Sequence, residues 1–83
     1  MELTVKVRLS EPMEVKRAAN IATKMGTYSS QVLMKSGNIT VNAKSLMGIL
    51  TMNLQNGQAI TIVAEGDDEA QAINELTNLL NEK

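Results

Sequence analysis

The first half of the chain contains two different spacings of apolar residues. Polar and apolar residues alternate from residue 2 to residue 9, with the apolar ones at Leu3, Val5, Val7 and Leu9. This period of two predicts a β-strand with one apolar and one charged face. Pro12 breaks the alternation and predicts a loop. From residue 15 the spacing changes to three and four, which predicts an amphipathic helix that ends at Gly26. Its apolar positions are Val15, Ala18, Ala19, Ala22 and Met25.

The middle of the chain predicts a hairpin followed by a short helix. Alternation resumes on both sides of Ser36-Gly37-Asn38, with apolar residues at Val32, Met34, Ile39 and Val41. Gly37 supplies the positive φ angle that a tight turn needs, so two antiparallel strands are expected. A nearly continuous apolar cluster then covers residues 46–54, and Ser45 stands before it as a natural helix N-cap.

A last strand and a closing helix complete the pattern. After a turn predicted at Asn56-Gly57, residues 60–64 alternate as the residues of a strand do. Asp68, with Gln71 three residues later, resembles a capping box at the start of a helix. The apolar stripe of that helix consists of Ala72, Ile73, Leu76, Leu79 and Leu80.

The predicted element order is therefore β-α-β-β-α-β-α. Because the middle pair of strands has the pattern of a hairpin, a purely parallel sheet is not expected. The order favours an α+β fold, an open-faced two-layer β-sandwich in which a four-stranded, mostly antiparallel sheet carries the helices on one face. A chain of 83 residues has room for one hydrophobic core, so residues 1–83 are expected to form a single domain.

Composition removes several classes of function. The sequence contains neither cysteine nor histidine, which excludes disulfides, thiol chemistry and the commonest general base and metal ligand. No enzyme template is matched, and no cofactor or metal site is expected. A net charge of −1 and a lone aromatic residue, Tyr28, argue against direct nucleic-acid binding. The sequence has no apolar run of membrane-spanning length and no recognisable signal peptide, so a cytoplasmic protein is expected.

Three segments are candidates for function. Residues 10–17 place two carboxylates and two basic side chains at a predicted helix start, a pattern typical of capping electrostatics and compatible with an anion site. Ser45 is suited to cap a helix, and a phosphate at the same place would also be stabilised by free helix N–H groups. The helix after Ser45 is apolar almost all round, so part of it is expected to form an exposed protein-binding patch.

The segment around this serine resembles a known family. Residues 41–50 read Val-Asn-Ala-Lys-Ser-Leu-Met-Gly-Ile-Leu, similar to the regulatory-serine segment of the HPr family, the histidine-containing phosphocarrier proteins of the bacterial sugar phosphotransferase system. The resemblance continues through Asn56-Gly57, residues 60–66 and the closing helix, and the length and the element order also agree. It covers essentially the whole chain and implies the HPr-like fold, with Ser45 as the phosphorylated serine.

The second functional segment of the family is altered in this chain. Aligned on Ala18-Ala19, the phosphocarrier motif Thr-Gly-Leu-His-Ala-Arg-Pro-Ala-Ala corresponds to Glu-Pro-Met-Glu-Val-Lys-Arg-Ala-Ala at residues 11–19. Glu14 then takes the place of the phosphorylated histidine, Lys16 that of the arginine and Arg17 that of the proline. A carboxylate does not reproduce the imidazole as a phosphoryl relay, and lysine lacks the bidentate guanidinium fork. The phosphocarrier activity is therefore not expected here.

The resemblance implies a regulatory protein of the phosphotransferase system and of carbon catabolite repression, similar to family members that lack the histidine. The implied partners are HPr kinase/phosphorylase, which would phosphorylate Ser45, the catabolite control repressor, and other phosphotransferase proteins. The protein is expected to be a monomer or a weak homodimer. With Ile49 turned toward the core, the docking patch for partners is expected to consist of Lys44, Leu46, Met47 and Leu50.

Two alternatives stay open at the level of the sequence. In one, the chain is a phosphoryl-transfer component in which Glu14 carries a transient acyl phosphate, or which competes for phosphotransferase enzymes. In the other, it is an unphosphorylated interaction module that binds partners through the apolar helix. The three hypotheses differ in which residue, if any, accepts a phosphoryl group.

Overall fold

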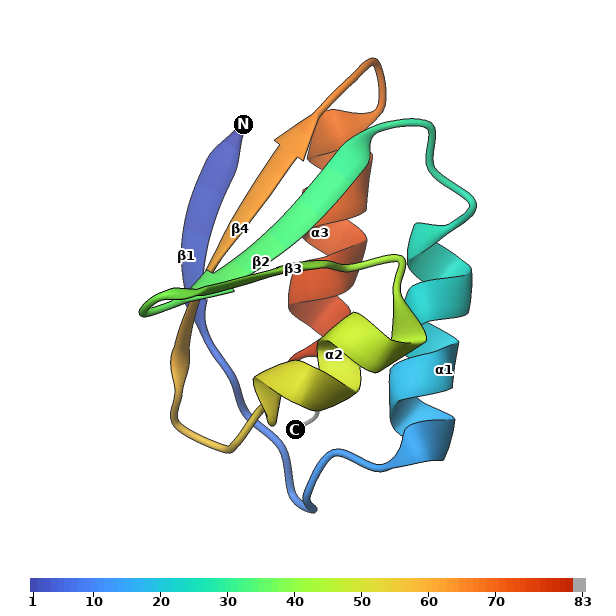
Figure 1. The fold of residues 1–83 in the computed structure, drawn as a ribbon. Helices are drawn as coiled ribbons and strands as arrows, with labels where there is room; N and C mark the ends of the chain where they lie inside the picture. Colours follow the sequence, from blue (N-terminus) through green and yellow to red (C-terminus); the bar gives the residue numbers. More distant parts are fainter. Residues whose placement is uncertain (82–83) are drawn as a thin grey trace.

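The computed structural model describes residues 1–81, and its elements follow the order expected from the sequence (Figure 1). The four strands are β1 (Glu2–Lys6), β2 (Gln31–Ser36), β3 (Ile39–Asn42) and β4 (Ala59–Glu65). The three helices are α1 (Val15–Met25), α2 (Leu46–Met52) and α3 (Glu69–Leu79). The predicted hairpin joins β2 to β3, and Gly37 in its turn has a φ of 59°, as expected.

Strand β4 lies inside the sheet although it is the last strand of the chain. The strand order is β1-β4-β2-β3, and each neighbouring pair is antiparallel. β1 and β3 therefore form the two borders of the sheet. One isolated parallel bridge, between Arg8 and Asn81, lies outside the named strands. The predicted α+β fold with a mostly antiparallel sheet is confirmed.

One face of the sheet is buried beneath the helices. Alternate residues of the two inner strands point into this core and have no exposed surface: Val32, Met34, Ile60, Ile62 and Ala64. The helices contribute a second layer of buried side chains to the same cluster: Ala18, Ile21, Met25, Ile49, Met52, Ala72, Ile73 and Leu76. The intervening strand residues point to the opposite face, which carries no helix. This alternation produces the open-faced two-layer arrangement.

The buried stripe of α1 differs from the prediction at its first position. The side chain of Val15 is 60% exposed, because it begins the helix before the helix reaches the core. Ile21 is buried instead, since it follows Ala18 by three residues and precedes Met25 by four, which places all three on one face. Gly26 ends the helix as expected, but with a right-handed backbone conformation (φ −65°) rather than the left-handed one usual for such glycines.

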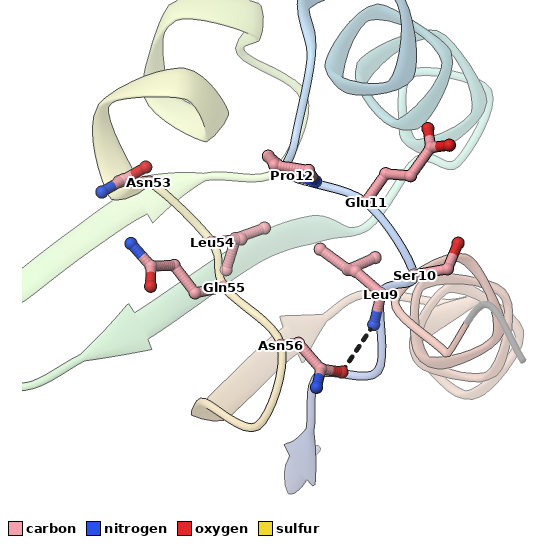
Figure 2. Close-up of a pocket in the computed structure, with 8 residues that line it drawn as sticks. All are labelled: Leu9, Ser10, Glu11, Pro12, Asn53, Leu54, Gln55 and Asn56. Carbon is pink, nitrogen blue, oxygen red and sulfur yellow. Dashed lines mark hydrogen bonds between the residues drawn. The ribbon is translucent and has the colours of Figure 1, made fainter.

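The loop that follows β1 is fastened to the turn that precedes β4 (Figure 2). The N–H of Leu9 donates to Oδ1 of Asn56 over 2.9 Å. Val7 donates its N–H to the carbonyl of Gln58 and accepts a bond from the N–H of Gly57. These contacts continue the β1–β4 ladder past the end of β1 and direct the chain toward α1.

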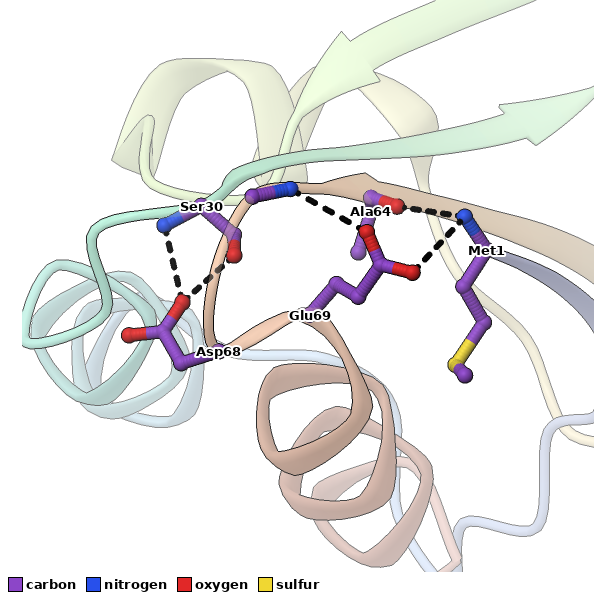
Figure 3. Close-up of polar contacts among 6 residues, drawn as sticks. Met1, Ser30, Ala64, Asp68 and Glu69 are labelled. Atoms are coloured by element: carbon purple, nitrogen blue, oxygen red, sulfur yellow. Dashed lines mark hydrogen bonds and ion pairs between the residues drawn. The ribbon is translucent and has the colours of Figure 1, made fainter.

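The start of α3 differs from the predicted capping box, because the Asp68 side chain bonds to no N–H of its own helix. Its carboxylate accepts hydrogen bonds from the hydroxyl and the N–H of Ser30 (Figure 3). It also accepts one from the N–H of Ser29. The predicted pairing with Gln71 is therefore wrong. The Ser30 hydroxyl, followed by the Ser29 N–H, stabilises the charged carboxylate and lowers the pKa of Asp68 from its ordinary 3.8 to about 2.

Glu69 supplies the local contact that was expected of Asp68. One carboxylate oxygen of Glu69 accepts a bond from the N–H of Gly66 over 3.1 Å, and the other lies 3.5 Å from the amino nitrogen of Met1 (Figure 3). That nitrogen also donates to the carbonyl of Ala64 over 2.7 Å. Asp68 and Glu69 thus tie the start of α3 to the segment before β2 and to the strand pair β1–β4.

We expect the Asp68→Asn substitution to lower the melting temperature near neutral pH and to weaken its acid dependence. The pKa of Asp68 is lower in the folded chain than in the unfolded one. The stabilisation from its charge is therefore complete above about pH 4 and is lost as the pH falls toward about 2. Thermal unfolding across this range should show the difference between wild type and variant shrinking. Glu11→Gln, at an exposed carboxylate, is the control; a difference independent of pH would contradict the assignment.

Candidate functional site

The side chain of Ser45 caps the first turn of α2, as the sequence predicts. Its Oγ accepts a hydrogen bond from the N–H of Gly48 over 3.0 Å, and its backbone is extended. A Cβ atom at position 48 would lie 3.3 Å from this Oγ and 3.2 Å from Cβ of Val41. Glycine at position 48 therefore lets α2 begin close to β3 while leaving space around the hydroxyl.

The side chains of α2 divide between the core and the surface. Ile49 and Met52 are buried, whereas the side chain of Met47 is 69% exposed. Leu46 and Leu50 lie between these extremes and pack partly against the core. The inward position of Ile49 and the outward position of Met47 are confirmed. The exposed apolar surface is narrower than the sequence suggests, with Met47 as its main part.

Lys44 is held in place just before this helix. Its Nζ donates to the carbonyl oxygen of Tyr28 over 2.8 Å, and its N–H donates to Oδ1 of Asn42 over the same distance. Tyr28 follows α1 and donates its phenol hydrogen to the carboxylate of Glu75 in α3. This bond to Glu75, with burial and the negative charge, raises the pKa of Tyr28. The segment that leads to Ser45 is therefore anchored to both α1 and α3.

The second predicted group lies at the start of α1. Glu14 is the N-cap residue by backbone position, but its side chain makes no capping hydrogen bond. Glu14 lies in a shallow depression of about 380 Å³. The depression is also lined by Glu11, Lys16, Arg17 and Asn20. Two carboxylates balance two basic side chains there, so the depression lacks the excess positive charge that favours an anion site.

A neighbouring depression of about 370 Å³ lies between the loop after β1 and the segment after α2 (Figure 2). Glu11 lines both depressions. The sequence does not reveal this second one, because its two walls are brought together by the bond between Leu9 and Asn56, 47 residues apart. The one feature of the sequence that pointed to this depression is the turn predicted at Asn56-Gly57, which forms part of one wall. The lining residues are Leu9, Ser10, Glu11, Pro12, Asn53, Leu54, Gln55 and Asn56.

The structure keeps the two predicted groups of residues apart. α1 packs against α2. The contact between Lys44 and Tyr28 places Ser45 toward the C-terminal end of α1, whereas Glu14 lies at its N-terminal end. Ser45 therefore shares a surface with Met47, and Glu14 with Lys16. A reaction at Ser45 therefore need not involve Glu14.

Two further observations concern residues 1–81, the part that the structure describes. Within it, no three or more Asp and Glu side chains are grouped so that they could hold a metal ion. No helix in that part is long and apolar enough to cross a membrane.

Known proteins resemble this chain over nearly its whole length. The family described as "PTS HPr component phosphorylation site" matches residues 1–82. The HPr-like protein Crh of Bacillus subtilis is 30% identical over 79 residues, which cover 95% of this chain and 93% of Crh. The phosphocarrier protein HPr of Haemophilus influenzae is 33% identical over 76 residues, which cover 92% of this chain and 89% of that protein.

Solved structures agree with these relationships. HPr of Bacillus anthracis superposes with a TM-score of 0.91 at 28% identity, covering 98% of this chain and 96% of that one. A crystal structure of Bacillus subtilis Crh, described as a swapped dimer, gives a TM-score of 0.77 at 30% identity, covering 92% and 87%. Phosphocarriers of this family are carriers rather than catalysts. The strand order, the helices and these similarities over nearly the full length show that the chain belongs to the HPr family of the bacterial phosphotransferase system.

Proposed function

We propose that this chain is a cytoplasmic regulatory protein of the phosphotransferase system, a single non-enzymatic domain that is switched by phosphorylation of Ser45. The observation that carries the proposal is the place of Ser45 at the start of α2, two residues before the exposed Met47. HPr kinase/phosphorylase is the proposed kinase, and the catabolite control repressor is the proposed partner of the phosphorylated form.

The proposed switch acts through charge. The kinase would transfer the γ-phosphoryl group of ATP to Oγ of Ser45, releasing ADP and the hydroxyl proton. A phosphoserine carries about −1.5 to −2 charges near neutral pH and three strong acceptor oxygens. These oxygens suit the arginine or lysine side chains of a partner, so affinity changes while the fold is kept. The ammonium group of Lys44 supplies positive charge nearby and holds the segment through its bond to Tyr28.

The same partner would use the apolar surface of α2. Met47 is exposed, flexible and polarisable, properties typical of side chains at adaptable protein interfaces. Leu46 and Leu50 extend this surface from their half-buried positions. An apolar anchor beside a switchable charge lets a partner combine constant affinity with dependence on phosphorylation.

We propose that Glu14 occupies the position of the family's relay histidine and that the chain does not relay phosphoryl groups. Its carboxylate makes no capping bond and lies in a depression with Glu11, Lys16 and Arg17. An acyl phosphate on a carboxylate is a different and more labile species than a phosphohistidine. The balanced charges of this depression also offer no strong attraction for a phosphate donor.

Phosphorylation of Ser45 is tested directly with purified kinase. Incubation with HPr kinase/phosphorylase and ATP should add one phosphoryl group to the wild type and none to Ser45→Ala, by intact mass spectrometry and peptide mapping. Ser29→Ala, at another exposed serine, should behave as the wild type. Loss of the bond to Gly48 should cost Ser45→Ala about 0.5–2 kcal/mol of stability, so melting curves must show that the variant is folded. Phosphorylation mapped to another residue would contradict the proposal.

A second experiment tests the loss of phosphoryl relay. Enzyme I and phosphoenolpyruvate should give no stable phosphorylated form of the wild-type chain. Glu14→His alone should recover little transfer, because Pro12, Lys16 and Arg17 also depart from the family motif. Label that passes from phosphoenolpyruvate to the native chain and then to a sugar-specific domain would favour the relay alternative.

A third experiment compares the two faces of α2. Met47→Asp should change the free energy of unfolding by under about 0.5 kcal/mol, since the side chain is exposed. It should weaken binding to the kinase or repressor by about 1 kcal/mol or more if Met47 is an anchor. Ile49→Ala should instead cost about 2–5 kcal/mol of stability. Equal destabilisation by both variants would show that α2 has no free face for a partner.

A further inference from the structure

Strand β1 forms one border of the sheet, and no other strand within residues 1–81 lies beyond it (Figure 1). Met1 exchanges two hydrogen bonds with Ala64, from its amino group over 2.7 Å and to its carbonyl over 2.8 Å. Because backbone groups alternate sides along an antiparallel strand, the odd-numbered residues of β1 bond to β4. Glu2, Thr4 and Lys6 therefore direct their N–H and C=O groups away from the sheet.

The sequence of β1, Glu-Leu-Thr-Val-Lys, is complementary to itself when two copies run antiparallel and cross at Thr4. Glu2 then lies opposite Lys6 of the second copy, Leu3 lies opposite Val5, and Thr4 lies opposite Thr4. One face of the joined strands carries two pairs of opposite charges, and the other carries two apolar pairs. A shift by two residues loses both pairs of Glu2 with Lys6. One such shift would set Glu2 opposite Arg8, but the N–H of Arg8 already donates to the carbonyl of Leu80, so the register that crosses at Thr4 is favoured.

The backbone geometry is compatible with the same register and excludes registers shifted by one residue. The residues that direct their backbone groups outward are the even-numbered ones, and this register sets even-numbered residues opposite one another. In each of the three even-numbered pairs, the two residues can then exchange two backbone hydrogen bonds. Side-chain complementarity and backbone complementarity are independent requirements, and β1 meets both in one alignment.

Three side chains of β1, those of Glu2, Leu3 and Lys6, are exposed in the separate chain, whereas the Thr4 hydroxyl forms a hydrogen bond with that of Thr61. Leu3 faces the core side, opposite Ile62, yet its side chain is 45% exposed because no strand covers it beyond the border. Glu2 and Lys6 are exposed, and within residues 1–81 neither side chain makes an ion pair or hydrogen bond. Charged side chains on an edge strand usually prevent pairing. Here their signs are placed so that two copies attract.

We propose that this chain forms a symmetric dimer through antiparallel pairing of the two β1 edges, which joins two four-stranded sheets into one continuous sheet. The contact is a short strand pair, so the dimer is weak and depends on concentration. Each β1 remains paired with its own β4, unlike the exchange of segments in a swapped dimer. Because α2 follows the opposite border strand β3, the dimer leaves Ser45 and Met47 accessible.

Charge reversal tests the register in solution. Glu2→Lys sets two lysines opposite each other twice in the dimer, and Lys6→Glu does the same with two glutamates. Each single variant should associate about tenfold more weakly than the wild type, in sedimentation equilibrium of untagged protein at low ionic strength. An equimolar mixture of the two variants should regain wild-type association, because every contact between unlike chains is again attractive. The double variant should regain it alone.

Two further variants separate assembly from folding. Thr4→Pro removes an outward N–H that β4 does not use, together with the exposed hydrogen bond between the hydroxyls of Thr4 and Thr61. The melting temperature should therefore fall only slightly while the dimer is lost. Lys35→Glu is the matched control, since it changes the net charge as Lys6→Glu does but lies on β2, away from this edge. A wild type that stays monomeric at all concentrations would overturn the proposal. So would a dimer that is unaffected by both single reversals, as a swapped dimer would be.

Discussion

The burial of one face of β4 is the interaction on which the rest of the structure depends. Ile60, Ile62 and Ala64 have no exposed surface, and their strand pairs with β1 on one side and with β2 on the other. Burying each isoleucine contributes roughly 1.5–3 kcal/mol. Because β4 alone joins the first strand to the β2–β3 hairpin, the sheet is complete only when this late segment has been inserted.

The same constraint decides what α2 can expose. The helix has seven residues and must turn Ile49 and Met52 toward the core, so Met47 on the opposite side has nothing to cover it. Ser45 caps its first turn, and Gly48, which has no side chain, lets that turn lie close to Val41 of β3. The Ser45 hydroxyl, the proposed site of phosphorylation, therefore lies beside an apolar surface. This proximity is a direct consequence of packing a short apolar helix against the edge of the sheet.

The two borders of the sheet have different surroundings. β3 leads into α2, and Lys44 links that corner to α1 through Tyr28. β1 has a strand on one side only, so Leu3 remains partly exposed although it belongs to the core-side face. The proposed phosphorylation and the proposed self-association thus use opposite borders. A modification at one border can change partner binding without competing with contacts at the other.

The sequence by itself determined the element order, the hairpin turn at Gly37, the N-cap at Ser45 and membership of the HPr family. These features depend on residue types at short spacings, which local backbone preferences translate directly into structure. Only the tertiary structure decided that Asp68 bonds to Ser30, 38 residues away, that Val15 is exposed, and that β4 lies inside the sheet. Periodicity shows which residues share a face, but which distant segment covers that face depends on how the packed elements compete for the same core.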